Sequence, residues 1–260
     1  MRALLPLLLL LVACPSPEGN SDSDDPGTSP PVLDDPVEDN QRAGTGDFAR
    51  DFLAGDTYTR LVIEIDYVSG HAPSESALDS MVSRFESLLD KPDGIVWQLD
   101  DAIPDQGAPA WTPQQTRELE VTWRDQYRDP DAGVAVLHML YLDGHSASDT
   151  DNGRILGFAY QGSSIVMFEE SMAASSGGLL GGEVEPVVLI HEVGHQLGLV
   201  NTGTPMVEDH QDVDHGAHCD NDQCIMFWTA ETSGVTDMLL GTEPDFDDRC
   251  LNDMQANGGL

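Results

Sequence analysis

Two histidines and one glutamate form the most chemically suggestive group in this 260-residue sequence. They occur as His191-Glu192-Val-Gly-His195. On a helix the two histidines lie one turn apart on the same face, so both imidazoles can bind one zinc ion. The adjacent carboxylate of Glu192 can then take a proton from a water molecule that the metal activates. The spacing therefore predicts a zinc site with His191 and His195 as metal ligands and Glu192 as general base.

Gly198 follows the second histidine, where glycine can take the left-handed conformation that ends a helix. The resulting HExxHxxG pattern resembles that of the metzincin metallopeptidases, whose motif continues to a third histidine and whose metal lies above a methionine-containing turn. Asn201 stands where that third histidine is expected. A neutral amide is a poor zinc ligand, so the third ligand must come from elsewhere in the chain.

Three histidines lie further downstream, namely His210, His215 and His218. His218 opens the segment H-C-x4-C-x-M, which ends at Met226 and resembles the archaemetzincin branch of the metzincins. The resemblance implies His218 as third ligand rather than His210 or His215, with Met226 in the Met-turn beneath the metal. It also implies that residues 200–217 are an insertion.

Three cysteines accompany this segment, namely Cys219, Cys224 and Cys250. The resemblance implies a second, structural zinc held by these thiols, with Asp253 at the position of the fourth cysteine. The alternative is one disulfide and one free thiol, because exported proteins reach an oxidising compartment.

The N-terminus predicts export. An apolar run from Ala3 to Val12 is too short to span a bilayer and ends at Ala13-Cys14. This ending resembles a bacterial lipobox, so residues 1–13 are interpreted as a lipoprotein signal peptide and Cys14 as the acylated residue. An ordinary signal peptide with a chance cysteine is the alternative. The lipobox reading predicts a protein anchored by lipid to the bacterial cell envelope, at the outer membrane or the cell surface.

Composition divides the rest of the chain. Residues 14–52 are rich in Pro, Ser, Asp and Gly, which predicts a disordered acidic tether. Residues 53–260 are long enough for one catalytic domain, with an upper subdomain over 53–198 and a lower one over 199–260. The sequence holds 47 acidic residues against 11 Lys and Arg, which argues against nucleic acid as a partner.

Hydrophobic periodicity predicts alternating strands and helices. Strands are expected over 58–67, 94–99, 134–142, 155–160 and 164–168, with 134–142 central in the sheet. Helices are expected over 74–89, 112–127 and 183–197, and one further helix near 230–240. This order predicts an α/β fold with a mixed, mostly parallel twisted sheet, an active-site helix and a small irregular C-terminal subdomain.

The resemblance implies a zinc-dependent peptidase that hydrolyses peptide bonds in a peptide or protein substrate. It also implies that the strand over 154–160 lies at the edge of the sheet and pairs with an extended substrate. Two alternatives keep the fold without this activity: a catalytically inactive surface lipoprotein, and a lipoprotein that only binds metal. The intact Glu192 favours the hydrolase, because a pure binder does not need this carboxylate.

Overall fold

The computed structural model describes residues 29–107, 110–150, 153–175, 181–240 and 244–260. The predicted signal peptide, Cys14 and residues 14–28 of the predicted tether lie outside these ranges. Within them, no helix is both long enough and apolar enough to cross a membrane.

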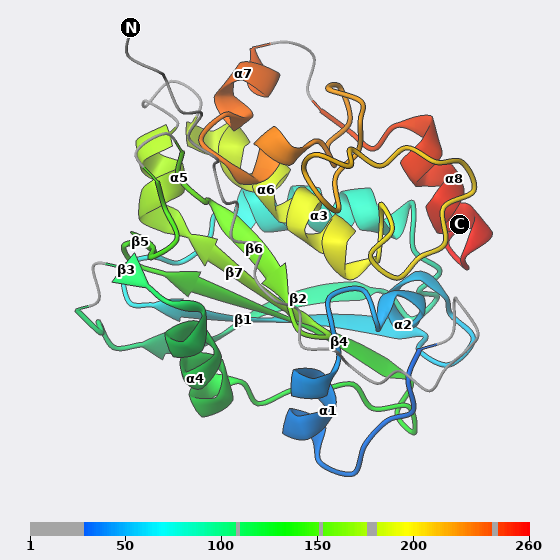
Figure 1. Cartoon of the computed structure of the whole chain (residues 1–260). Helices are drawn as coiled ribbons and strands as arrows, with labels where there is room; N and C mark the ends of the chain where they lie inside the picture. The colour runs from blue at the N-terminus through cyan, green and yellow to red at the C-terminus, as the bar shows by residue number, and fades with distance from the viewer. Residues whose placement is uncertain (1–28, 108–109, 151–152, 176–180, 241–243) are drawn as a thin grey trace, which may run out of the picture.

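A five-stranded sheet of order β2-β1-β4-β7-β6 forms the centre of the protein (Figure 1). Its strands are β1 (Arg60–Val68), β2 (Ile95–Ile103), β4 (Val134–Leu142), β6 (Gly157–Tyr160) and β7 (Ser164–Phe168). The first four in spatial order are parallel, and the edge strand β6 is antiparallel to β7. The predicted mixed, mostly parallel α/β fold is confirmed. Strand β4 lies in the middle of the sheet and is buried along almost its whole length. This position agrees with the continuous apolar run in its sequence.

Helices cover both faces of this sheet (Figure 1). Helices α3 (Glu75–Glu86) and α6 (Gly181–Gln196) pack together on one face, and α1 (Pro36–Arg42) and α4 (Pro113–Trp123) lie on the other. A capping box between Thr112 and Gln115 starts α4, with Pro113 in its first turn. Three further short elements lie before α6, namely β3 (Ala110–Trp111), β5 (His145–Ser146) and α5 (Glu169–Ser175).

After α6 the described chain adds no strand to the central sheet. A long loop leads from α6 to the 3-10 helix η1 (Trp228–Glu231), which is followed by α7 (Val235–Leu239) and α8 (Asp248–Ala256). These three helices lie on the same side of the sheet as α6 (Figure 1). The helix expected near 230–240 is thus divided into η1 and α7. Helix α8 was not predicted from the sequence.

The prediction of a disordered tether over 14–52 is wrong for its second half. Helix α1 and helix α2 (Ala49–Leu53) are folded onto the domain. Arg128 is buried and pairs with Asp39 at 2.7 Å and with Asp51 at 2.6 Å. Its guanidinium also lies 3.7 Å from the ring centre of buried Phe48. The composition of residues 29–52 did not predict this folded segment. Its carboxylates favour solvent unless they are neutralised, and the arginine that neutralises them, Arg128, is distant in the sequence.

Candidate functional site

Helix α6 holds His191 and His195 in fixed positions. The middle of the helix is anchored in the core through buried apolar residues, among them Val187, Val188 and Leu189. The two imidazoles are buried, and their Nε2 atoms lie 3.1 Å apart. One-turn spacing on a helix therefore brings the two nitrogens to one point, as the sequence predicts.

His218 joins this pair from the loop after α6. Its ring centre lies 5.3 Å from that of His191 and 5.0 Å from that of His195. The Nε2 atom of His218 is buried and has no hydrogen-bond partner among the residues that the structure describes. Of the three loop histidines, His218 is the one that the structure places beside the two helix histidines.

Backbone carbonyls orient two of the three rings. Nδ1 of His191 lies 2.6 Å from the carbonyl oxygen of Ile225, and Nδ1 of His218 lies 2.6 Å from that of His215. A carbonyl only accepts, so each Nδ1–H donates. This contact leaves Nε2 of each ring as the atom that can bind a metal.

The turn after α6 depends on Gly198. Its φ of 71° lies in the left-handed region. A Cβ there would come within 2.6 Å of the Thr204 amide nitrogen and 2.9 Å of the Ala49 Cβ. Gly46 approaches the same turn so closely that its Cβ would lie 2.2 Å from the Thr202 carbonyl oxygen. Glycine therefore lets the chain turn sharply toward the third histidine while the N-terminal segment packs against the turn.

Glu192 is fully buried next to this cluster. Both of its carboxylate oxygens lack a hydrogen-bond partner within the described protein. Burial raises the pKa of Glu192 well above its ordinary value, and the negative charge of Glu231 adds to the increase. Burial also lowers the pKa of His195 well below its ordinary value, and the nearby His191 and His218 lower it further. The neutral form of His195 is therefore favoured.

Met226 lies directly under α6. Its side chain is buried, and a Cβ added to Gly194 would come within 2.3 Å of its sulfur atom. The segment of Met226 therefore approaches the helix between the two helix histidines, which is the place that the resemblance implies for a Met-turn.

Glu231 belongs to the same cluster, although the sequence did not point to it. Its carboxylate oxygens lie 3.6 Å from His218 Nε2, 3.9 Å from His191 Nε2 and 4.0 Å from His195 Nε2. One ligand atom from each of these four residues lies within 4.8 Å of the others. The only available signal was its position five residues after Met226, which by itself predicts no role.

The other two loop histidines lie elsewhere. His215 is exposed at 41% of its side chain, stacks on Trp228 at 4.5 Å between ring centres, and lies 2.6 Å from an Asp212 oxygen. His210 is buried in a second cluster, away from α6.

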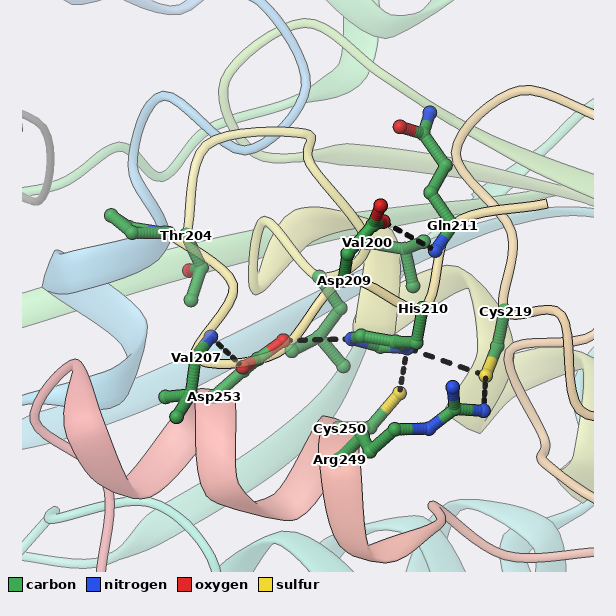
Figure 2. A network of polar contacts seen from close by, with 12 residues as sticks. Val200, Thr204, Val207, Asp209, His210, Gln211, Cys219, Arg249, Cys250 and Asp253 are labelled. Carbon is green, nitrogen blue, oxygen red and sulfur yellow. Dashed lines mark hydrogen bonds and ion pairs between the residues drawn. The ribbon is translucent and has the colours of Figure 1, made fainter. Parts of the chain in front are cut away.

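This second cluster consists of His210, Cys219, Asp247 and Cys250, and Cys224 lies next to Cys250. Figure 2 shows His210 between Asp253 and the sulfur atoms of Cys219 and Cys250. His210 Nδ1 lies 3.3 Å from Cys219 Sγ and 4.0 Å from Cys250 Sγ, and Cys224 Sγ lies 3.7 Å from Cys250 Sγ. Cys219, Cys224 and Cys250 are buried, and no disulfide joins them within the described part of the chain. Hydrogen bonds from Cys224 and Cys250 lower the pKa of Cys219 well below its ordinary value, whereas contacts with neighbouring thiols raise the pKa of Cys224 and Cys250. Without a metal the cluster therefore favours one thiolate, on Cys219.

The printed distances between these sulfur and nitrogen atoms are compatible with ligands of one zinc ion, and Asp247 offers a further oxygen within 4.8 Å of His210, Cys219 and Cys250. A zinc–sulfur bond of about 2.3 Å implies sulfur–sulfur edges of about 3.8 Å. The fourth member is His210 and not Asp253, which the resemblance implied. Asp253 Oδ2 instead lies 2.8 Å from His210 Nε2, on the far side of the ring from the thiols (Figure 2). A carboxylate in this position holds the imidazole with Nδ1 directed at the sulfurs.

The expected substrate-pairing strand is shorter and partly covered. Strand β6 begins at Gly157, and residues 154–156 pair with residues 231–233. The Leu156 amide donates to the Glu231 carbonyl at 2.9 Å, and the Ser233 amide donates to the Arg154 carbonyl at 3.1 Å. This edge is therefore already paired next to the histidine cluster.

Comparison with known proteins supports the fold. No protein-family model matches the sequence, and no curated protein is significantly similar to it. Among solved structures, the archaemetzincin from Methanopyrus kandleri is similar, with a TM-score of 0.51 and 16% sequence identity. The match covers 76% of this chain and 96% of the archaemetzincin chain. The chain therefore has an archaemetzincin-like fold.

Proposed function

We propose that the protein is a zinc-dependent peptidase that uses Glu192 as general base. The observation that carries the proposal is the convergence of three imidazole Nε2 atoms beside a buried carboxylate that has no other partner. His191, His195 and His218 would hold the ion. Three neutral nitrogen ligands are the donor set of many catalytic zinc sites.

A zinc ion in this position would acidify a water molecule and polarise the carbonyl of the scissile peptide bond. Glu192 would accept the proton from that water and later deliver it to the departing amine. Its neighbour His191 is oriented by the Ile225 carbonyl, so the metal and the base keep a fixed relation to each other. Neither Glu192 oxygen has a hydrogen-bond partner by geometry among the described residues, which leaves both available for this transfer.

The Glu192→Gln variant tests the proposal. The amide keeps the shape of the side chain but cannot accept the proton, so peptide hydrolysis should fall by roughly 100-fold or more while zinc content stays the same. Zinc content is measured by mass spectrometry and hydrolysis with an unstructured protein substrate, with and without a chelator. A variant that holds zinc and cleaves as fast as the wild type would contradict the assigned base. A wild type that holds zinc but cleaves no substrate would favour a metal-binding lipoprotein.

We also propose a second, structural zinc bound by Cys219, Cys224, Cys250 and His210. Its support is the close spacing of buried thiols and imidazole, with Asp253 as hydrogen-bond partner of the ring. Asp253→Asn should weaken metal binding at this site, because loss of such a partner costs about 10- to 100-fold in affinity. A disulfide in the purified protein, detected by mass spectrometry under denaturing conditions without reductant, would contradict it.

The proposed location is the bacterial cell envelope, with a lipid anchor at Cys14. Its support is the sequence that precedes this cysteine. The substrate in this setting would be a peptide or protein, and the strong negative charge of the chain argues against a nucleic acid.

A further inference from the structure

The Glu231 carboxylate occupies the place where the catalytic site needs an open position. Zinc bonds of about 2.0–2.2 Å to nitrogen and oxygen give tetrahedral edges of about 3.3–3.5 Å. Glu231 Oε2 lies 3.9 Å from His191 Nε2 and 4.0 Å from His195 Nε2, Glu231 Oε1 lies 3.6 Å from His218 Nε2, and the Nε2 atoms of His191 and His195 are 3.1 Å apart. One ligand atom from each residue lies within 4.8 Å of the others, so a small movement of the carboxylate would complete a tetrahedron around an ion.

The backbone of Glu231 is held in this place. Its carbonyl accepts the Leu156 amide at 2.9 Å, and Thr232 forms an antiparallel bridge with Ile155. These bonds use the chain edge that leads into β6, next to the metal cluster. An extended peptide could use the same kind of bonds when it pairs with a strand edge. The segment 231–233 thus holds both a backbone position and a metal position that a substrate would need.

The donor set around Glu231 is suited to a divalent ion. The side chain of Glu231 is 29% exposed and that of Glu192 is fully buried. One nitrogen from each of the three histidines and one oxygen of Glu231 lie within 4.8 Å of one another. Three imidazoles and one carboxylate are all zinc ligands, so one ion could bind all four groups.

On these grounds, and resting on the proposed zinc peptidase function, we propose that Glu231 is a fourth ligand of the catalytic metal in the resting protein. Sites with four protein ligands are closed, whereas catalytic zinc sites keep one position for water or substrate. The resting protein is therefore latent. Glu231 must withdraw from the metal before water and a peptide carbonyl can reach it.

Cobalt-substituted protein tests this proposal without relying on activity. Cobalt(II) reports its coordination by visible absorption, and azide serves as a small probe of an open position. The spectrum of a His191→Ala protein is subtracted to remove cobalt held at the cysteine cluster. Wild type should show no azide-dependent change, whereas Glu231→Gln and Glu231→Ala should show one. Asp237→Asn is the matched control, because it removes the same charge from an exposed position in α7 and should behave as wild type.

Metal affinity gives a second readout. In competition with a chelator, Glu231→Gln should bind cobalt at least roughly tenfold more weakly than wild type. Loss of a residue that only hydrogen-bonds to a metal ligand already costs about tenfold, and loss of a ligand should cost no less. Hydrolysis by the same variant should rise, because the open position is freed. Equal affinity and equal azide response in wild type and Glu231→Gln would overturn the role of Glu231 and leave the peptidase proposal intact. If His191→Ala binds as much cobalt as wild type, the metal site itself is wrong and both proposals fail.

Discussion

Gly194 lies on α6 where the helix contacts the side chain of Met226. Its replacement by alanine therefore tests how tightly the two pack. A Cβ at this position would lie 2.3 Å from Met226 Sδ, 3.2 Å from Met226 Cε and 3.3 Å from Phe246 Cε1. Met226 is fully buried, so its side chain has little room to move. Overpacking of this kind costs about 1–3 kcal/mol. The gain from replacing glycine within a helix offsets roughly 0.5–1 kcal/mol of that cost.

The second variant in this test is Met226→Ala, which should itself cost about 2–5 kcal/mol through the cavity that it leaves. In that background the atom that clashes with the new methyl group is gone. Gly194→Ala should then cost much less, because only the 3.3 Å approach to Phe246 Cε1 opposes the helix propensity gain of about 0.5–1 kcal/mol. The cost of Gly194→Ala should therefore be clearly smaller in the Met226→Ala background.

Urea unfolding of the four proteins, at one fixed free zinc concentration and again in chelator, measures this coupling. The chelator series separates packing from metal binding, since the clash does not depend on an ion. An equal cost of Gly194→Ala with and without Met226 would refute the inferred packing of Met226 under the helix.

Three further perturbations test other parts of the molecule. Arg128→Met leaves two buried carboxylates unpaired and should cost about 3–5 kcal/mol in urea unfolding, whereas Arg42→Met removes an exposed ion pair and should cost under about 1 kcal/mol. Similar costs for both would show that residues 29–53 do not pack as described. His218→Ala should lose zinc from the active site under a chelator challenge that His215→Ala withstands, and the reverse order would invalidate the ligand assignment. Cys14→Ser should release the protein from the membrane fraction, and unchanged fractionation of the mature variant would disprove the lipid anchor.

The sequence predicted those parts of the site that lie close together along one helix. His191, Glu192 and His195 are related by helical geometry alone, and Gly198 marks the end of the helix through its own conformational freedom. The continuous apolar run of β4 likewise predicts a strand that is buried on both faces.

Features that depend on distant contacts were not predictable from local patterns. His210 and Asp253 are 43 residues apart and meet only because the loop after α6 returns to α8. The position of Glu231 depends on pairing with residues 154–156, which precede it by more than 70 residues. Helix α1 was missed because its acidic residues favour solvent unless Arg128 is present. Spacing along the sequence contains no information about such neighbours.

The close contact of Gly46 with the turn at Gly198 means that residues before 53 belong to the folded domain. A protein shortened to begin at residue 53 would retain every proposed metal ligand and every strand of the central sheet. It would nevertheless lose the backbone that packs against Thr202, just where the loop leading to the third histidine begins. Gly203 makes the reciprocal contact, because its Cβ would lie 2.4 Å from the Gly46 carbonyl oxygen. Cleavage by a foreign protease between residues 43 and 53 should therefore loosen the turn after α6, although the cut lies more than 130 residues upstream of His191.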